Sequence, residues 1–298
     1  MNIIILGAGA IGSLFGAKLS GMNDVILIAK KEHAGAINKN GLRMTGLENK
    51  TYRIKAAGKI NEIKENTLII LSTKVCDSEK AINPIKKLIR KDTIILCLQN
   101  GLYSEDIVKK IVGGKCTVLR GITNFGAMYL KPGYVNYTNY SYTAIEKGKG
   151  SREIAEAFKK CGLNGYAADD IKYEMWKKLV FNCVLNPITA ILKIKNKGIT
   201  DEKLNPLKKL VADECLAVAE KDGISFDIDF VRTINNEFRN SGNVSSMQQD
   251  MIKGKRTEIG WLNGAVAGLG RKYGIKCPVN EALAKIIKEM ERLGRTKI

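Results

Sequence analysis

MNIIILGAGAIGSLFGAKL, at residues 1–19, is the stretch that decides the fold of this chain. A β-branched apolar run ends at Gly7, and apolar residues then recur at helical spacing, which predicts a strand, a tight turn and a helix. Gly7 permits the turn, Gly9 lets backbone N–H groups approach a pyrophosphate, and Gly12 lets the helix pack closely on the strand. The positive end of the helix dipole then faces the anion, so the stretch predicts a dinucleotide-binding loop.

A second apolar strand, Val25–Ile28, follows at the distance that such a fold requires. NAD-specific sites usually place Asp or Glu after this strand, to bind the ribose hydroxyls, but here Ala29-Lys30-Lys31 follows. Two cations without a carboxylate suit a 2′-phosphate, so we expect NADPH, with NADH possible because Glu32 comes next. The alternative is a pair of ordinary surface lysines.

Composition indicates a globular protein of the cytoplasm. The 298 residues, 45% of them hydrophobic, allow two domains with a substantial core. No apolar run approaches the ~20 residues that span a bilayer, and no secretory leader is expected. The seven cysteines contain no CxxC pair, which is typical of reduced thiols, and no metal site is expected.

The formal net charge of +19 raises nucleic acid as a possible partner. The lysines are dispersed along the chain, aromatic residues make up only 6%, and no nucleic-acid-binding motif is present. We therefore expect a small anionic substrate and a phosphorylated cofactor, and no nucleic-acid partner. A general lysine bias of the source proteome is the other explanation of the charge.

Strands alternate with helical spacers in the first half of the chain. Thr67–Ser72 and Thr93–Leu98 are short apolar runs, typical of a parallel sheet that is buried on both faces. Segments near Thr117–Gly121 and Tyr134–Tyr142 are expected to complete this sheet. Lys74 and the Asn100 region follow two of the strands, where ligands bind in such sheets, so both are predicted to lie beside the cofactor.

Helical periodicity replaces this pattern from about residue 166 onward, after a glycine-punctuated stretch at residues 161–165. The predicted class is therefore α/β, with an N-terminal Rossmann-type parallel-sheet domain and an all-helical C-terminal domain. We place the dinucleotide-binding domain at residues 1–165 and the substrate-binding domain at residues 166–298.

WKKLVFNCVLNP, at residues 176–187, sets one lysine and two asparagines four residues apart. On a helix, Lys178, Asn182 and Asn186 share one face. Buried polar groups need partners, and a small oxygen-rich substrate would supply them, whereas the alternative is a solvated helix face. Pro187 is expected to bend or end the helix there.

Together these residues resemble the ketopantoate reductase (2-dehydropantoate 2-reductase) family over essentially the whole chain. The resemblance rests on the Gly7–Gly12 loop, Thr73-Lys74, Leu98–Gly101, residues 176–187, and Ser245–Asp250 followed by Thr257-Glu258-Ile259. It implies NADPH-dependent reduction of 2-dehydropantoate to pantoate, in pantothenate and coenzyme A biosynthesis. It also implies an active site between a Rossmann domain and a helical domain, and a possible homodimer that pairs through the helical domain.

Site residues follow from the same resemblance, position by position. It implies Lys178 as the general acid and Glu258 as a second catalytic residue, beside cofactor and substrate. The cofactor-binding positions that it implies are Gly7, Ala8, Gly9, Ala10, Ile11, Gly12, Lys30, Lys74, Asn100, Ala127 and Glu258. The substrate-binding positions that it implies are Asn100, Lys178, Asn182, Asn186, Asn196, Asn243, Ser245 and Ser246.

Reduction of a 2-oxo acid needs a hydride at the carbonyl carbon and a proton for its oxygen. A lysine that is buried beside Lys177 would have its pKa lowered from about 10.4 toward neutrality, which suits Lys178 to this task. His33 lies too near the adenosine end of a cofactor to be the acid and is expected at the surface. Glu258 has the alternative of being an exposed carboxylate at a helix start.

Two other functions stay open on the sequence. A paralogous reductase of the same fold, acting on a different 2-oxo or 3-oxo acid, would keep Lys178 and Asn182 but differ around Asn196 and Asn243–Ser246. A cofactor-binding redox sensor without catalysis would have no need for the lysine and asparagines at residues 178–186.

Overall fold

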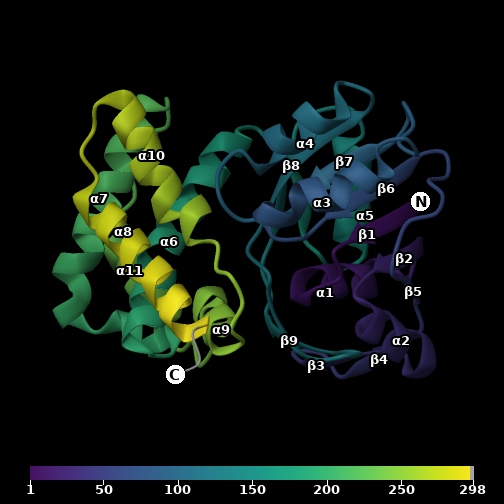
Figure 1. Cartoon of the computed structure of the whole chain (residues 1–298), viewed down its shortest axis with the longest axis horizontal. Coiled ribbons are helices and arrows are strands. Elements are labelled where there is room, and N and C mark those ends of the chain that lie inside the picture. The colour runs from purple at the N-terminus through teal and green to yellow at the C-terminus, as the bar shows by residue number, and fades with distance from the viewer. Residues whose placement is uncertain (296–298) are drawn as a thin grey trace. The chain divides into compact units, whose positions relative to one another are not determined.

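The computed structural model describes residues 1–295, and these fold into two compact units (Figure 1). The first unit comprises Met1–Gln99 and Tyr103–Glu174, and the second comprises Asn100–Leu102 and the chain from Met175 onward. The predicted boundary near residue 165 is too early. Residues from there onward form β12 (Gly165–Ala168), whose backbone pairs with another strand of the first unit.

An eight-stranded sheet forms the centre of the first unit, in the order β12-β11-β8-β7-β6-β1-β2-β5. The run from β8 to β5 is parallel throughout, whereas β11 is antiparallel to β8. The strands besides β12 are β1 (Asn2–Leu6), β2 (Asp24–Ile28), β5 (Lys55–Ala57), β6 (Thr67–Leu71), β7 (Ile94–Cys97), β8 (Thr117–Thr123) and β11 (Thr143–Glu146). The predicted α/β class with a Rossmann-type parallel sheet is confirmed.

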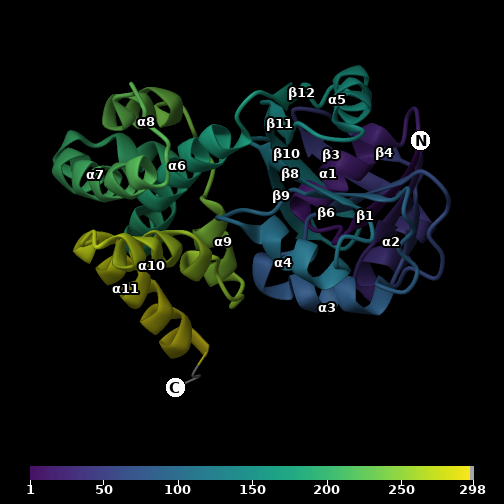
Figure 2. The same ribbon diagram turned by 90° about the horizontal axis from the view of Figure 1, so that it is seen from above.

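Helices cover both faces of this sheet, which explains its uninterrupted apolar strands. Ile3 and Ile5 of β1 pack in one core with α1 (Ala10–Leu19), α2 (Lys31–Asn40) and α5 (Ser151–Lys160). Ile4 and Leu6 pack in the other core with α3 (Ser78–Ile82) and α4 (Ser104–Val112). Figure 2 shows α3 and α4 on one side of the strands and α5 on the other. Short 3₁₀ helices η1 (Val75–Asp77) and η2 (Asn83–Ile85) flank α3.

A second, four-stranded sheet of the first unit was not predicted. It comprises β3 (Leu42–Gly46), β4 (Lys50–Tyr52), β9 (Gly126–Lys131) and β10 (Tyr134–Asn139), in the order β4-β3-β10-β9 (Figure 1). The expectation that residues 134–142 complete the main sheet is therefore wrong for β10. Alternate residues of β10 are buried, and Val135 and Tyr137 pack on the core shared with α1, which is the pattern of a sheet with one covered face.

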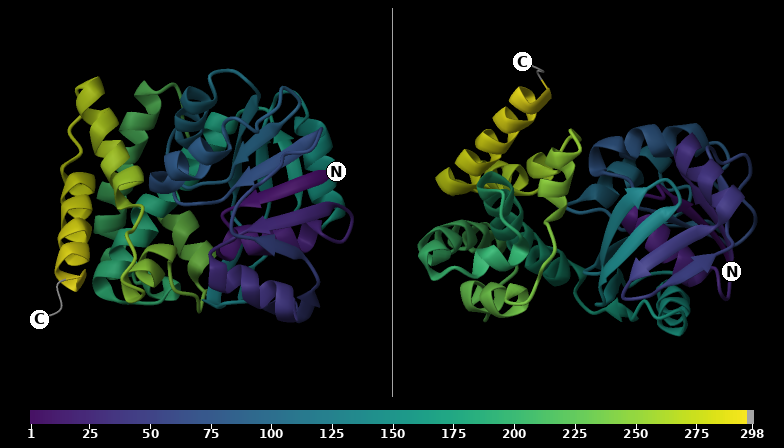
Figure 3. Two further views of the ribbon diagram at one scale, coloured as in Figure 1. Left: turned by 45° about the vertical axis from the view of Figure 1, so that its right-hand side comes forward. Right: turned by 90° about the horizontal axis from the view of Figure 1, so that it is seen from below.

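The second unit contains helices and no strand within the described part of the chain, as Figure 3 shows, so the predicted all-helical C-terminal part is confirmed. Its helices are α6 (Ile171–Leu192), α7 (Asn205–Lys221), α8 (Phe230–Phe238), α9 (Ser246–Ile252), α10 (Asn263–Tyr273) and α11 (Pro278–Arg295), with 3₁₀ helices η3 (Asn196–Thr200), η4 (Glu202–Leu204) and η5 (Ile259–Trp261). None of the helices in residues 1–295 is long and apolar enough to cross a membrane.

Pro187 does not end α6, which continues to Leu192, so this alternative of the prediction is wrong, and the bend stays a prediction. A proline inside a helix leaves the carbonyl four residues earlier, here that of Cys183, without its helical donor. Asn263 Nδ2 donates to this carbonyl oxygen at 3.0 Å. The helix can therefore pass through the proline without leaving a buried acceptor unpaired.

His33 is buried, with 3% of its surface exposed, and not at the surface as predicted. It shares the apolar face of α2 with Ile37 and packs edge-on against Tyr129, with ring centroids 5.0 Å apart. The backbone N–H of Gly133 donates to His33 Nδ1 at 2.9 Å, and Nε2 lies 3.1 Å from Ser13 Oγ. Because Nδ1 accepts, the ring is neutral with its proton on Nε2, and burial lowers the pKa of His33.

We predict that His33 makes the fold less stable in acid. Its pKa in the folded chain lies below the ordinary 6.5, so the unfolded chain binds more protons at intermediate pH. The stabilisation is present above pH 6.5 and is lost as the pH falls toward the folded-state pKa. Urea denaturation of wild type and of His33→Asn, which stays neutral, should give a difference in unfolding free energy that shrinks from about pH 7.5 to about pH 5.5. A difference that grows toward acid would contradict the neutral, buried imidazole.

Candidate functional site

Backbone hydrogen bonds fix the glycine-rich turn of the first unit at the end of β2. The N–H groups of Gly7 and Ala8 donate to the Ile28 carbonyl oxygen at 3.2 and 2.8 Å. Gly7 has a φ of +102°, and a Cβ placed there would lie 2.6 Å from Thr73 Cγ2. Only glycine fits this position, because other residues would combine a strained backbone with a steric clash.

The start of α1 is open on the side that the turn faces. A Cβ at Gly12 would lie 2.5 Å from the Gly7 carbonyl oxygen, so the helix packs directly on the turn, whereas a Cβ at exposed Gly9 would meet nothing closer than 4.0 Å. Ala10 and Ile11 begin the helix, and its first turn carries no acidic side chain. Amides at a helix start lack helical acceptors, so this geometry fits an anionic group such as a pyrophosphate.

Two of the predicted cofactor-binding lysines flank this turn. Lys30 is exposed directly before α2, two residues beyond the Ile28 carbonyl that holds the turn. Lys74 is half-buried and follows Thr73, whose side chain lies against Gly7. Ala127 lies elsewhere in the first unit, half-buried on β9 opposite Tyr137 of β10.

Gln99 holds the segment at Lys74 and was not assigned a role from sequence. Its Nε2 lies 3.1 Å from the Thr73 carbonyl oxygen, 3.2 Å from that of Lys74 and 2.9 Å from Ser78 Oγ. A polar residue directly after a buried strand, in a sheet whose loops carry the ligand, is the signal that could have identified it. Gln99 therefore fixes the loop after β6 to the end of β7.

In the second unit, Lys178, Asn182 and Asn186 lie on successive turns of α6, spanning about 12 Å. Trp176, on the same helix, is fully buried, and its Nε1 donates to Asp222 Oδ2 at 2.8 Å. Lys178 and Asn182 are half-buried. Asn186 is 3% exposed, and its carboxamide makes no hydrogen bond with the described residues, so a solvated helix face does not describe it.

Asn196 and Asn243 meet through their backbones, because the Asn196 N–H donates to the Asn243 carbonyl oxygen at 2.8 Å. Asn196 is 7% exposed, and its Oδ1 has no hydrogen-bond partner among residues 1–295. A buried acceptor without a donor costs free energy unless a ligand or water supplies one. Asn196 is therefore suited to binding a hydroxyl group.

Ser245 and Ser246 differ in what they offer a ligand. Ser245 is buried, and its Oγ caps α9 by accepting from the Gln248 N–H at 3.3 Å. The same oxygen lies 2.8 Å from Thr189 Oγ1 on α6. Ser246 is exposed. The Ser245 hydroxyl thus joins α9 to α6, and Thr189, which the sequence analysis missed, belongs to this contact.

Asn100 and Glu258 were each predicted to lie beside cofactor and substrate, and they are in direct contact in the second unit. Asn100 Nδ2 donates to Glu258 Oε2 at 2.9 Å. Gly101 has a φ of +85°, and a Cβ there would lie 2.6 Å from the Trp261 carbonyl oxygen, so the turn after Asn100 sits tightly on η5. Glu258 is half-buried directly before η5, and is not the exposed helix-start carboxylate of the alternative reading.

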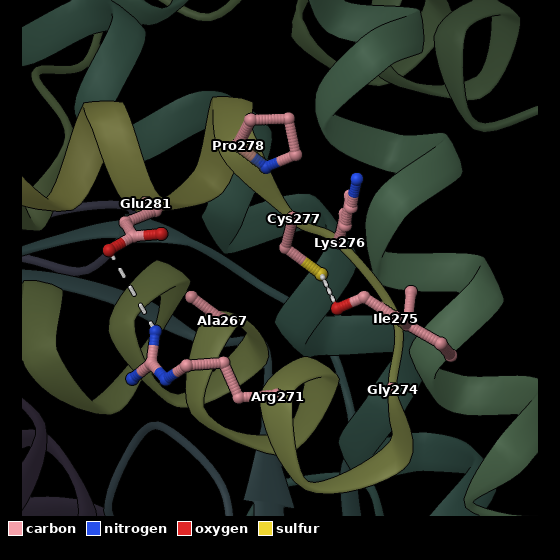
Figure 4. Close-up of a pocket in the computed structure, with 8 residues that line it drawn as sticks. All are labelled: Ala267, Arg271, Gly274, Ile275, Lys276, Cys277, Pro278 and Glu281. Carbon is pink, nitrogen blue, oxygen red and sulfur yellow. Dashed lines mark hydrogen bonds and ion pairs between the residues drawn. The ribbon is translucent and has the colours of Figure 1, made fainter.

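A pocket of the second unit lies where α10 leads into α11 (Figure 4). Its lining includes Arg271 and Glu281, 3.9 Å apart, and Cys277, whose Sγ lies 3.9 Å from the Ile275 carbonyl oxygen. Burial raises the pKa of Cys277 to about 11, so its thiol stays protonated and unreactive at neutral pH. None of the predicted site residues lines this pocket.

Comparison with known proteins identifies one family over most of the chain. Residues 3–150 match the family described as Ketopantoate reductase PanE/ApbA, and residues 170–291 match its C-terminal part. The 2-dehydropantoate 2-reductase of Pyrococcus horikoshii is 37% identical over 99% of each chain. The crystal structure of a PanE/ApbA family ketopantoate reductase from Ralstonia eutropha JMP134 has a TM-score of 0.91 and 26% identity, covering 99% of this chain and 100% of that one.

A second solved structure of similar fold carries a different enzyme name. D-mandelate dehydrogenase, determined with NADH and anilino(oxo)acetate, has a TM-score of 0.91 and 29% identity, and the match covers all of both chains. Two family matches that together span most of the chain, and a relative above 30% identity over nearly its full length, agree with the glycine-rich turn and the α6 residues. This chain belongs to the ketopantoate reductase family.

Proposed function

We propose that this protein reduces 2-dehydropantoate to pantoate with NADPH. The observation that carries the proposal is one face of α6. Lys178 and Asn182 lie there with Asn186, a buried residue whose carboxamide has no hydrogen-bond partner within residues 1–295. A donor cation followed by two amides suits an acid with a carbonyl and a carboxylate. The 2-dehydropantoate 2-reductases that this chain resembles over their full length support the substrate.

The chemistry divides between the cofactor and the side chains. NADPH, when bound, supplies the hydride that the carbonyl carbon receives. Negative charge develops on the carbonyl oxygen, and Lys178 Nζ would stabilise that charge and donate the proton. Because Lys178 is half-buried, solvent can return a proton to it after each turnover. Asn182 and Asn186 would orient the acid by donating to its oxygens.

Glu258 and Asn100 would act as one unit. The hydrogen bond from Asn100 Nδ2 to Glu258 Oε2 fixes the orientation of the carboxamide. Asn100 Oδ1 then remains an acceptor for a hydroxyl or amide of a bound ligand. Glu258 would in this way position Asn100 beside cofactor and substrate, and not itself transfer the proton.

A second candidate function is reduction of another 2-oxo acid by the same fold. It is favoured by the similarity to D-mandelate dehydrogenase, which was solved with NADH. Asn196 would separate the two functions. Its buried Oδ1, which has no hydrogen-bond partner in the described part of the chain, suits the terminal hydroxyl of 2-dehydropantoate, which the oxo acid of mandelate lacks. A redox sensor without catalysis gives no reason for the polar face of α6.

Replacing the proposed acid tests the mechanism. Lys178→Ala should lower kcat for 2-dehydropantoate by roughly 10²- to 10⁴-fold, with KM for NADPH nearly unchanged, because general acid catalysis contributes about that much. The assay follows NADPH oxidation by its absorbance. Lys221→Ala, which removes an exposed lysine at the end of α7, is the control and should leave the rate unchanged. Retention of kcat within about threefold in Lys178→Ala would remove this lysine from the mechanism.

Reversing the charge at Lys30 tests cofactor choice. Lys30→Glu should weaken NADPH by about 10-fold or more and NADH far less, because it replaces a phosphate contact with repulsion. Lys39→Glu makes the same change at the exposed far end of α2 and controls for the net charge. Titration of each variant with both cofactors gives the affinities. Equal weakening of NADPH and NADH by Lys30→Glu would mean that Lys30 does not contact the 2′-phosphate, and Lys74 would replace it in the proposal.

Substrate selection tests the two candidate functions against each other. We expect kcat/KM for 2-dehydropantoate to exceed that for 2-oxoisovalerate, which lacks the hydroxyl, by at least about 10²-fold. Asn196→Ala should reduce this ratio mainly by slowing the reaction of 2-dehydropantoate. Equal turnover of the two acids by the wild type, or a preference for phenylglyoxylate, the oxo acid of mandelate, would support the second candidate.

A further inference from the structure

Pro187 interrupts the hydrogen bonds of α6 between two residues of its polar face. Proline has no N–H, so the Cys183 carbonyl oxygen cannot accept its usual bond, and the proline ring presses against the same carbonyl. Lys178 and Asn182 come before this carbonyl, and Asn186 comes after it. Cys183 is fully buried, so water does not readily replace the missing donor.

Asn263 supplies a donor at this point from another helix. It is the first residue of α10 and is 0% exposed. Its Nδ2 donates to the Cys183 carbonyl oxygen at 3.0 Å and to Asn280 Oδ1 at 2.9 Å. The two N–H groups of one carboxamide are therefore both used, and the side chain is held in a single orientation.

Asn280 fixes Asn263 in turn and ties the contact to two more helices. Asn280 lies on α11, and its Nδ2 lies 2.8 Å from Glu214 Oε2 and 3.2 Å from the Val211 carbonyl oxygen, both on α7. The donor that replaces the missing N–H thus rests on a buried network that joins α6, α7, α10 and α11. A loose surface side chain would not hold the Cys183 carbonyl in one place.

We propose that Asn263 is a positioning residue, which replaces the N–H missing at Pro187 and so keeps Lys178 and Asn182 in fixed register with Asn186. Without this donor, the Cys183 carbonyl oxygen would have no partner at the position of the proline ring, and α6 would kink at Pro187. The lysine would then shift relative to the second amide, although Asn263 itself touches neither substrate nor cofactor. This inference rests on the proposed role of the α6 face.

A double-mutant cycle with Pro187 separates this role from a general loss of packing. Pro187→Ala restores a backbone N–H that can donate to the Cys183 carbonyl. Replacement of Asn263 should therefore destabilise this variant less than it destabilises the wild type. Thermal unfolding should show a clear loss of Tm for Asn263→Ala in the wild type and a smaller loss in the Pro187→Ala background. If Asn263→Ala does not fold but the double variant does, that rescue is the same result. Equal losses in both backgrounds would overturn the replacement of the missing N–H.

Steady-state kinetics test the consequence for the site. Asn263→Ala should lower kcat/KM for 2-dehydropantoate by up to about 10²-fold, with a raised KM for this acid and an unchanged KM for NADPH. In the Pro187→Ala background, the fold-decrease in kcat/KM caused by Asn263→Ala should be smaller by at least about 10-fold. Tyr273→Phe, which removes the hydrogen bond from Tyr273 Oη of α10 to Asp222 Oδ1 at 3.0 Å, is the control and should leave the KM for the acid unchanged.

The outcomes distinguish this inference from the proposed function. A merely less stable enzyme would show a lower kcat with the same KM for the acid, and that result would overturn the positioning role. If the wild type does not reduce 2-dehydropantoate, the proposed function fails. The double-mutant cycle in thermal unfolding still tests whether Asn263 replaces the N–H that is missing at Pro187.

Discussion

The close approach of α1 to β1 and β2 is the constraint on which the first unit depends. A Cβ at Gly12 or Gly16 would lie within 2.5 Å of neighbouring atoms, with Leu27 Cδ2 only 2.2 Å from the one at Gly16. The helix can therefore sit against the strands only because both positions lack a side chain. Because of this contact, α1 begins at the edge of the sheet where Lys30 follows β2 and Lys74 follows β6. Local backbone geometry thus sets the position of the proposed cofactor-binding groups.

Apolar periodicity predicted the parts of the fold that pack as regular layers. The strands that are buried on both faces and the helices of the second unit carry their pattern within one short segment. The second sheet could not be found in this way, because its strands β3 and β10 are far apart in the sequence. Arg43 of β3 pairs with Tyr134 of β10, some ninety residues later in the chain. His33 was misplaced for a related reason: its polarity suggested exposure, while its spacing from Ile37 placed it on the inner face of α2.

The resemblance named some site residues that the structure brings together and others whose side chains the fold itself uses. Asn100 and Glu258 were named from separate stretches of sequence, and they form a hydrogen bond. Ser245 was named as a ligand residue, but its hydroxyl caps α9 and bonds to Thr189. The spacing of Ser245 and Gln248 is that of a capping box, so the sequence held the signal for this internal role. Residue type alone could not show which hydroxyl is already used by the fold.

The placement of the polar residues along α6 has a consequence for substrate choice within this fold. Lys178, Asn182 and Asn186 occupy separate turns of one helix, and the glycine-rich turn belongs to the other compact unit. The proposed acid and the two proposed substrate-binding amides therefore stand on different turns, and each is supplied by a single residue. The same architecture is shared by a ketopantoate reductase and a D-mandelate dehydrogenase, so the fold does not by itself set which acid is reduced.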